Sequence, residues 1–274
     1  MKTSSAFGLK AKISLKTPSL LAMTAAALML FAGSLPVGHA DAERMDLETH
    51  RFLIEKLETV IKETPRGDTT RVPALLRLAD LFSERARLLS MQEIEAGCFD
   101  PSQSAPEKKA QCLVSKEDRR KAISYYEMAL SESSGASQSR ILFHLAHLYE
   151  MNGDNKKAES LYRRILSLGP KHFTKAVLGQ SQAGLGEIAF REKRFSEAKR
   201  QFELSLQNSA TPRKGWIQYR IAWCDLNLGR AEAGKQRLLG ILKTPSLLAL
   251  ESSTSSDGVK PDASFQEDIA RDLT

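Results

Sequence analysis

Residues 153–170 read GDNKKAESLYRRILSLGP, and this stretch decides how the chain folds. It opens on a turn glycine and closes on a Gly-Pro pair, which together predict a helix over about 155–168. Ala158 and Tyr162 lie on one face of that helix, because residues four apart are neighbours on a helix surface. Whether this face packs against another helix depends on whether the same spacing recurs elsewhere in the chain.

The spacing occurs four times. Each copy has a charged run, then a small residue, then a large apolar residue one helical turn later. The small residues are 36, 40 and 36 positions apart, and the pairs are Ala122 with Tyr126, Ala158 with Tyr162, Ala198 with Phe202, and Gly234 with Leu238. Each copy follows another helix-length apolar pattern with its own small residue, at Ala79, Ala146, Gly186 and Ala222.

This pattern predicts pairs of helices that pack closely. Two antiparallel helices can approach only where a side chain is small, and the large residue one turn later fills the space beside the contact. No such pair buries its apolar face alone, so we expect antiparallel pairs stacked into an all-α solenoid over residues 72–242. The composition agrees, since long segments are rich in Ala, Leu, Glu, Lys, Arg and Gln, which favour helix over strand.

The copy that contains Ala158 resembles the tetratricopeptide repeat, a helix-turn-helix unit of about 34 residues. The family's motif positions are matched by Leu142, Leu145, Ala146, Tyr149, Gly153, Ala158, Tyr162 and Pro170. The next copy keeps Leu185, Gly186, Phe190, Ala198 and Phe202, but has Lys193 at the turn and its proline late, at Pro212. The last copy keeps Ile221, Ala222 and Gly229 and departs at Gln218, Asp225 and Gly234. The resemblance implies a superhelix of stacked helix pairs.

In tetratricopeptide repeat proteins, the first helices of successive units line a concave groove that binds partners. Carried over by position, the resemblance implies that the groove here is lined by Arg140, Phe143, His147, Gln180, Ala183, Glu187, Trp216, Tyr219 and Trp223. The last three, which we call the aromatic stripe, include both tryptophans of the chain. If a C-terminal helix packs on the stripe, it is core; if nothing does, it is an exposed patch that calls for a ligand.

Segments outside the regular repeat have their own signals. Residues 43–66 predict an amphipathic helix that caps the solenoid, with a partner helix or coiled coil as the alternative. Residues 251–263 are expected to form a polar linker. Residues 264–274 predict a further helix with Ser264 as its N-cap, either as a terminal cap or as the start of a continuing chain.

The first repeat unit carries an insertion over residues 98–112, flanked by Cys98 and Cys112. In an exported protein a disulfide between these two cysteines would close the loop, and two free thiols are the alternative. The third cysteine, Cys224, falls within a helical apolar pattern and is expected to be a buried, inert thiol.

Residues 1–42 have the pattern of a secretory signal peptide. Four lysines and no acidic residue precede an uncharged apolar run over 19–37, and cleavage after Ala40 or Ala42 would leave small residues at the cut. An uncleaved membrane anchor is the alternative, because the run approaches the length that spans a bilayer. Cleavage leaves no integral membrane span in the mature chain. Removal of the four lysines up to Ala40 lowers the net charge from +7 to +3, so a nucleic-acid partner is not implied.

The sequence offers no catalytic constellation, cofactor motif or persuasive metal site. GLGEIA, at residues 184–189, matches a dinucleotide-binding spacing, but it falls inside a predicted helix rather than after a strand. His144 and His147 lie at i, i+3 with Glu150 one turn on, yet no further cysteine or histidine lies nearby in sequence. We therefore expect no catalytic residues, no metal and no cofactor.

The function that we expect from these features is a non-enzymatic protein-interaction scaffold or adaptor in the bacterial cell envelope, located in the periplasm. Its partners would be envelope proteins that bind in the groove, in a motility or other trans-envelope complex. The alternatives are an assembly factor or chaperone for outer-membrane proteins and a regulator of cell-wall enzymes. The leader and the stretch RLADLFSERA, residues 77–86, are also similar to envelope proteins associated with gliding motility.

Overall fold

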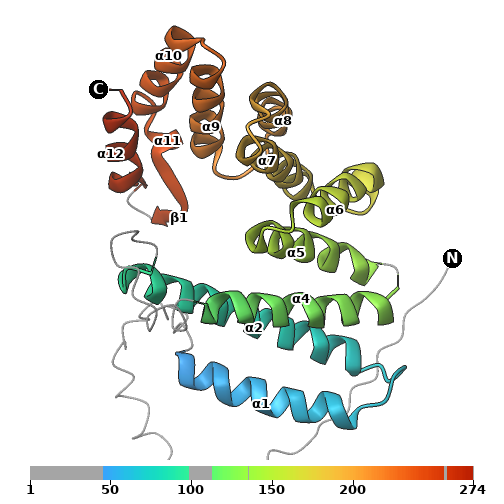
Figure 1. Ribbon diagram of the computed structural model, residues 1–274. Coiled ribbons are helices and arrows are strands. Elements are labelled where there is room, and N and C mark those ends of the chain that lie inside the picture. The colour runs from blue at the N-terminus through green and yellow to red at the C-terminus, as the bar shows by residue number, and fades with distance from the viewer. Residues whose placement is uncertain (1–45, 99–112, 135, 256–257, 274) are drawn as a thin grey trace, which may run out of the picture. The chain divides into compact units, whose positions relative to one another are not determined.

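The computed structural model describes residues 46–98, 113–134, 136–255 and 258–273 of the 274-residue chain. Helices that are adjacent in sequence pack against each other in order (Figure 1), and the prediction of an all-α solenoid of stacked helix pairs is confirmed. The longer helices are α1 (Leu47–Glu63), α2 (Arg71–Glu95), α4 (Val114–Glu132), α5 (Ala136–Asn152), α6 (Asn155–Leu168), α7 (Lys175–Arg191), α8 (Phe195–Gln207), α9 (Lys214–Asn227), α10 (Ala231–Leu242) and α12 (Ala263–Arg271). The repeat units are therefore α2 with α4, α5 with α6, α7 with α8, and α9 with α10.

The small-then-large spacing forms the contact between the two helices of each unit. Ala122, Ala158 and Ala198 are fully buried, and the aromatic residue one turn after each is also buried. The core runs as three successive clusters along the chain, the first from α1 to α7, the second from α7 to α9 and the third from α9 to α12. Such neighbour-to-neighbour burial is what makes a solenoid stable.

Two glycines let α7 approach the helices on either side of it. A Cβ atom on Gly186 would lie 2.7 Å from the ring of Phe202, on α8 of the same unit. A Cβ atom on Gly184 would lie 2.5 Å from the ring of Tyr162, on α6 of the preceding unit. The sequence spacing predicted the contact between Gly186 and Phe202. The contact between Gly184 and Tyr162 joins neighbouring units, and the repeat motif did not predict it.

The turns within the units require a left-handed residue. Gly153 and Gly229 adopt positive φ angles of 86° and 75° at two of these turns. Lys193 takes the corresponding position in the third unit with φ 60°, a conformation that costs a side-chain-bearing residue roughly 1–2 kcal/mol. The missing turn glycine of this copy is thus replaced without a change of fold.

A repeated polar contact links successive units beside this packing. The hydroxyl of the buried tyrosine on a second helix donates to a carboxylate on the first helix of its unit, and that carboxylate also pairs with an arginine of the next unit. The two sets are Tyr126 with Asp80 and Arg140, and Tyr162 with Glu150 and Arg191. The Tyr162 hydroxyl lies 2.8 Å from Glu150, and each arginine lies 3.1 Å from its carboxylate. Each carboxylate therefore accepts a tyrosine hydroxyl at one oxygen and an arginine at the other.

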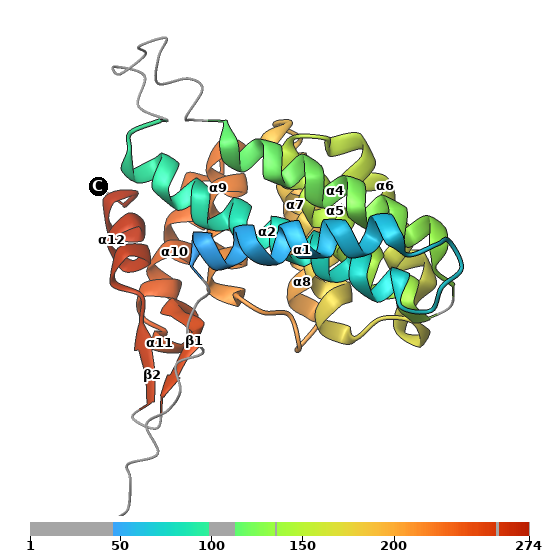
Figure 2. The same cartoon turned by 90° about the horizontal axis from the view of Figure 1, so that it is seen from below.

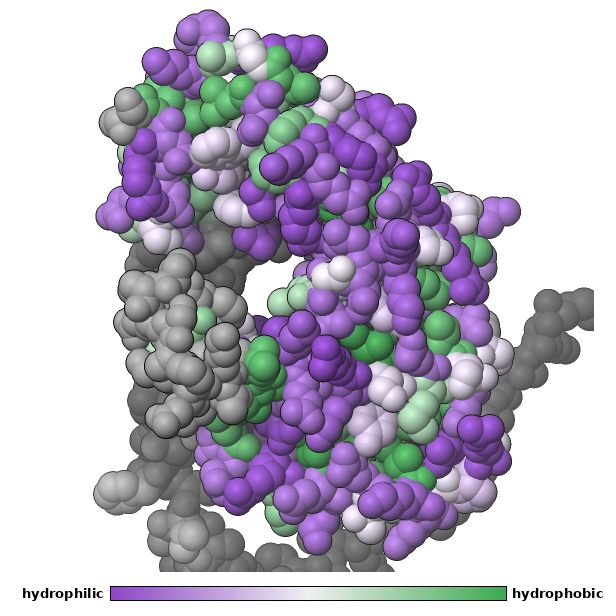
Figure 3. All heavy atoms as spheres, viewed as in Figure 1, coloured by the Kyte–Doolittle hydropathy of each residue, from purple (hydrophilic) through white to green (hydrophobic). Residues whose placement is uncertain are grey.

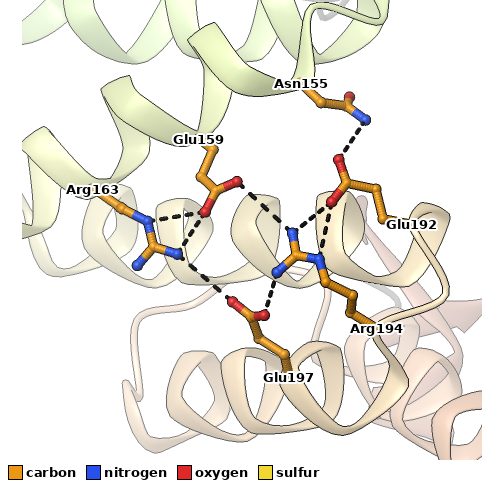
Figure 4. Close-up of polar contacts among 6 residues, drawn as sticks. All are labelled: Asn155, Glu159, Arg163, Glu192, Arg194 and Glu197. Atoms are coloured by element: carbon orange, nitrogen blue, oxygen red, sulfur yellow. Dashed lines mark hydrogen bonds and ion pairs between the residues drawn. The ribbon is translucent and has the colours of Figure 1, made fainter.

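Exposed charges form a second link between units, on the loops and second helices (Figure 4). Arg163 of α6 pairs with Glu159 at 2.6 Å and with Glu197 of α8 at 3.7 Å. Arg194, in the turn before α8, pairs with Glu192 at 2.7 Å, with Glu197, and with Glu159 at 3.8 Å. Each exposed pair contributes little alone, at most about 1 kcal/mol, although the network orders the turn.

Helix α1 is fastened to the first unit by a buried arginine. Arg71 donates from Nη1 to the carbonyl oxygens of Ile61 (2.6 Å) and Thr64 (2.5 Å), at the end of α1. Its Nε donates to Glu132 at 2.9 Å, at the end of α4. Because a helix C-terminus leaves carbonyls unpaired, a cation there is favourable. The predicted helix over 43–66 is thus observed over Leu47–Glu63, packed on α2.

The base of the predicted insertion is closed by a polar contact. Glu93, near the end of α2, is buried and accepts hydrogen bonds from the amide nitrogen (2.8 Å) and the hydroxyl (2.5 Å) of Ser115, in the first turn of α4. Cys98 is disulfide-bonded. Its predicted partner Cys112, with the rest of 99–112, lies outside the described residues, so the pairing stays a prediction.

The C-terminal segment differs from the sequence prediction. Instead of a polar linker over 251–263, the chain after the short helix α11 (Pro245–Leu248) forms strands β1 (Ala249–Ser255) and β2 (Gly258–Pro261), which pair antiparallel (Figure 2). Asp262, rather than Ser264, is the N-cap of α12, since its carboxylate accepts from the amide of Phe265. Ser264 instead donates its hydroxyl to Asp262 at 2.7 Å.

Substituting Gly184 with alanine tests the contact between units. In an open helix this change gains up to about 1 kcal/mol, but here the added methyl meets the Tyr162 ring, and we expect a loss of about 1–3 kcal/mol. Gly240, in α10, is the matched control, because a methyl group added there would have no atom within 4 Å; Gly240→Ala should stabilise. Urea unfolding monitored by circular dichroism separates the two, and equal midpoints would contradict the packing.

Candidate partner-binding groove

Six of the predicted groove residues line one pocket. They come from three successive first helices and are Phe143 and His147 of α5, Gln180, Ala183 and Glu187 of α7, and Trp216 of α9. The pocket, which we call the groove pocket, has a volume of about 270 Å³. Residues that are distant in sequence thus converge because equivalent faces of the first helices stack in register.

The wall of the groove pocket is held in place by a charged aromatic cluster. Glu187 accepts hydrogen bonds from Arg220 (2.9 Å) and from the indole nitrogen of Trp216 (3.3 Å). The guanidinium of Arg220 lies over the rings of Trp216 and Phe190, 4.8 Å and 4.7 Å from their centroids. Such contacts restrict the rotamers of the side chains that line the pocket, so less side-chain entropy remains to be lost on binding.

Other residues complete the pocket, and the groove positions did not identify them. Glu150 and Tyr162, which form the hydrogen bond described above, also line the pocket. Pro212 and Arg213 line it from the loop before α9. The late proline was noticed in the sequence only as a departure from the motif. A loop carries no helical periodicity, so its side chains cannot be placed on a face from spacing alone.

Arg140 does not belong to this pocket. Its side chain is 64% exposed and pairs with Asp80 of α2 at 3.1 Å, in the repeated polar contact. In this protein Arg140 therefore links the first two repeat units instead of lining the groove pocket.

The aromatic stripe is covered by helix α12, which decides the question that the sequence left open. The Phe265 ring centroid lies 6.0 Å from that of Trp216 and 5.6 Å from that of Tyr219. Asp272, which follows α12, accepts from the Tyr219 hydroxyl (2.7 Å) and from the indole nitrogen of Trp223 (3.2 Å). Tyr219 and Trp223 are thus half-buried beneath α12, and of the three stripe residues Trp216 alone contacts α12 and also lines the groove pocket.

The departure at Asp225 also has a structural role. This residue stands where the repeat has an aromatic side chain, yet it is buried, and it accepts from Lys199 of α8 at 2.6 Å. The adjacent Cys224 is a free, fully buried thiol. Burial, together with the charge of Asp225, raises the pKa of Cys224 to about 12, so the thiol is protonated and inert at neutral pH.

The histidine pair occupies two different environments. His144 stacks on Tyr126 with a centroid distance of 5.7 Å, and burial lowers its pKa, so the ring is neutral at pH 7. His147 is exposed at the groove pocket. Within the described ranges, three or more metal-binding side chains do not gather anywhere. GLGEIA lies inside α7, where Gly184 and Gly186 are contacted by aromatic rings.

The face seen in Figure 3 is mainly hydrophilic, with hydrophobic residues between the hydrophilic ones, for example over α10. None of the helices in the described part of the chain combines the length and the apolar character needed to cross a bilayer.

Comparison with known proteins identifies the repeat. Residues 139–172 match the tetratricopeptide repeat family model. No curated protein matches the chain significantly. Similar solved structures include the nearly identical TPR-like repeats of a Podosopora anserina protein assigned as a kinesin light chain (15% identity, 76% of this chain and 90% of that one, TM-score 0.47) and a tetratricopeptide repeat protein from Parabacteroides merdae (15%, 81% and 83%, 0.39).

Truncating Ile269 tests whether α12 covers the stripe. Ile269 is fully buried, so Ile269→Ala should cost about 2–4 kcal/mol locally and loosen α12. Both tryptophans of the chain belong to the stripe, and their emission should therefore shift to longer wavelength. Glu267→Ala, an exposed change in the same helix, is the control. Unchanged emission in the Ile269 variant would show that α12 does not cover the stripe.

Proposed function

We propose that this chain is a non-catalytic scaffold that binds a segment of a partner protein in the groove pocket. The observation that carries the proposal is the convergence of side chains from α5, α7 and α9 on one preorganised pocket. Aromatic surface from Phe143 and Trp216 supplies contact area, while Gln180, His147 and Glu187 can orient a peptide backbone through hydrogen bonds.

The size of the pocket favours a short recognition segment over an unfolded client chain. Its volume of about 270 Å³ lies just below the roughly 300–1,000 Å³ of typical ligand pockets. A chaperone for outer-membrane proteins would need a longer apolar groove that included Tyr219. Because α12 covers Tyr219, the contacts favour a scaffold. Regulation of a cell-wall enzyme would be one use of such a scaffold.

The proposed location is the periplasm of a bacterial envelope, in a motility complex or another trans-envelope complex. The basic start, the apolar run over 19–37 and the small residues before position 43 support export. The disulfide at Cys98 is compatible with an oxidising compartment.

N-terminal sequencing of the protein from a periplasmic fraction tests export. We expect a mature chain that begins at Asp41 or Glu43, because cleavage after Ala40 or Ala42 leaves small residues at the cut. An intact leader on membrane-bound protein would favour the anchor instead, and cytoplasmic protein with an intact leader would overturn export.

Photo-crosslinking tests the groove. A diazirine amino acid at His147, which is exposed at the pocket, should capture a partner in cells, whereas the same group at the exposed Arg164 on α6 should not. Adding Ala183→Arg, which fills the pocket, should reduce the capture at least about tenfold if the pocket is the site. Circular dichroism must show unchanged folding of that variant. The proposal would be contradicted if both positions captured the partner equally, or if Ala183→Arg left the capture unchanged.

A further inference from the structure

The carboxylate of Glu187, on the wall of the groove pocket, has one oxygen in use and one that is open. Its Oε1 accepts from Arg220 at 2.9 Å and from the indole nitrogen of Trp216 at 3.3 Å. No donor among the described residues bonds to its Oε2. Oε2 is also not one of the side-chain atoms in the described ranges that are both unpartnered and closed to solvent. The pocket therefore offers an accessible acceptor that the two bonds at Oε1 hold in place.

The charges around the groove pocket favour a neutral partner group. Glu150 and Glu187, which both line it, are already paired with arginines, at 3.1 Å and 2.9 Å. The guanidiniums of Arg213 and Arg220 lie over the Trp216 ring, 5.6 Å and 4.8 Å from its centroid. A lysine or arginine of a partner would meet these like charges, and an aspartate or glutamate would meet the two carboxylates. The group that suits Oε2 is therefore an uncharged donor.

The size and the lining of the groove pocket suit one aromatic side chain. Its volume of about 270 Å³ is below the range of drug-sized ligands, so it has room for one large side chain but not for several. The half-buried rings of Phe143 and Trp216 line it, and the short side chain of Ala183 leaves space beside them. Aromatic rings that pack together gain more than their buried area alone provides.

We propose that the groove pocket binds a tyrosine side chain of the partner segment, with its ring against Phe143 and Trp216 and its hydroxyl donating to Oε2 of Glu187. The inference rests on the proposed function and names the residue type that the site recognises. Tyrosine has a large apolar body and a polar tip. Its O–H rotates to meet an acceptor, whereas the N–H of tryptophan is fixed in the ring plane. A hydroxyl that donates to a carboxylate forms a charge-assisted hydrogen bond, which is stronger than a neutral one.

An NMR titration of the purified protein with acetylated, amidated pentapeptides tests this assignment. The peptides carry tyrosine, phenylalanine, tryptophan, leucine or lysine between two pairs of alanines. The indole N–H signal of Trp216 is the reporter, and that of Trp223, which donates to Asp272 beneath α12, is the internal control. We expect the tyrosine peptide to move only the Trp216 signal. It should bind about tenfold more tightly than the phenylalanine peptide, which would desolvate Oε2 without a donor.

Glu187→Gln tests the role of the open oxygen. The amide oxygen must take the place of Oε1 to accept from Arg220 and Trp216, so the amide nitrogen replaces the charged acceptor at Oε2. The tyrosine peptide should then lose most of its advantage over the phenylalanine peptide, which should bind as before. Glu203→Gln, an exposed change on α8 outside the pocket, should keep the tenfold preference. Circular dichroism checks that both variants are folded, and the peptide comparison on the unaltered protein decides the proposal even if Glu187→Gln is unstable.

The outcomes separate the tyrosine assignment from the proposed function. The assignment is overturned if another peptide moves the Trp216 signal with equal or higher affinity, or if folded Glu187→Gln keeps the preference for tyrosine. In both cases the pocket still binds a side chain, and the proposed function stands. If no peptide moves the Trp216 signal, the tyrosine site and the pocket as the place of segment binding are both overturned.

Discussion

The contact of aromatic rings with glycine is the constraint on which the rest of this structure depends. Helix α7 is contacted by Tyr162 on one side and by Phe202 on the other, at Gly184 and Gly186. Because no other residue fits there, the distance between helices is set by ring thickness, and the stacking of successive units follows from it. The polar contacts add direction to this packing, since each tyrosine hydroxyl reaches a carboxylate that also pairs with the following unit.

The groove pocket is a consequence of this stacking. With the first helices held in order, Phe143, Gln180 and Trp216 meet although they are widely separated in the chain. At the C-terminal end, α12 takes over the role of a further unit, because Phe265 and Ile269 cover apolar surface that would otherwise be open. Tyr219 and Trp223 therefore pack only beneath this C-terminal segment, whereas Trp216 also lines the groove pocket.

The role of each charged side chain in this protein depends on how deeply it is buried. Arg71 and Asp225 are buried and paired, and they fasten α1 and α9 to their neighbours. The exposed network around Arg194 orders a turn and contributes little free energy per pair. Lys116 and Arg119 belong to neither group, since neither forms an ion pair within the part of the chain that the structure describes.

The sequence by itself determined the helical class and the pairing of helices, and six of the positions that it predicted for a groove line one pocket. These follow from periodic small and large residues, which act locally and repeat. Only the tertiary structure decided that Gly184 lies at the contact between units, that Asp225 pairs with Lys199 and that Arg140 leaves the groove. It alone also decided that residues 249–255 and 258–261 pair as strands. It also decided that the aromatic stripe is covered. The reason is physical: each of these depends on a partner distant in sequence, and spacing within a helix carries no information about which distant surface will face it.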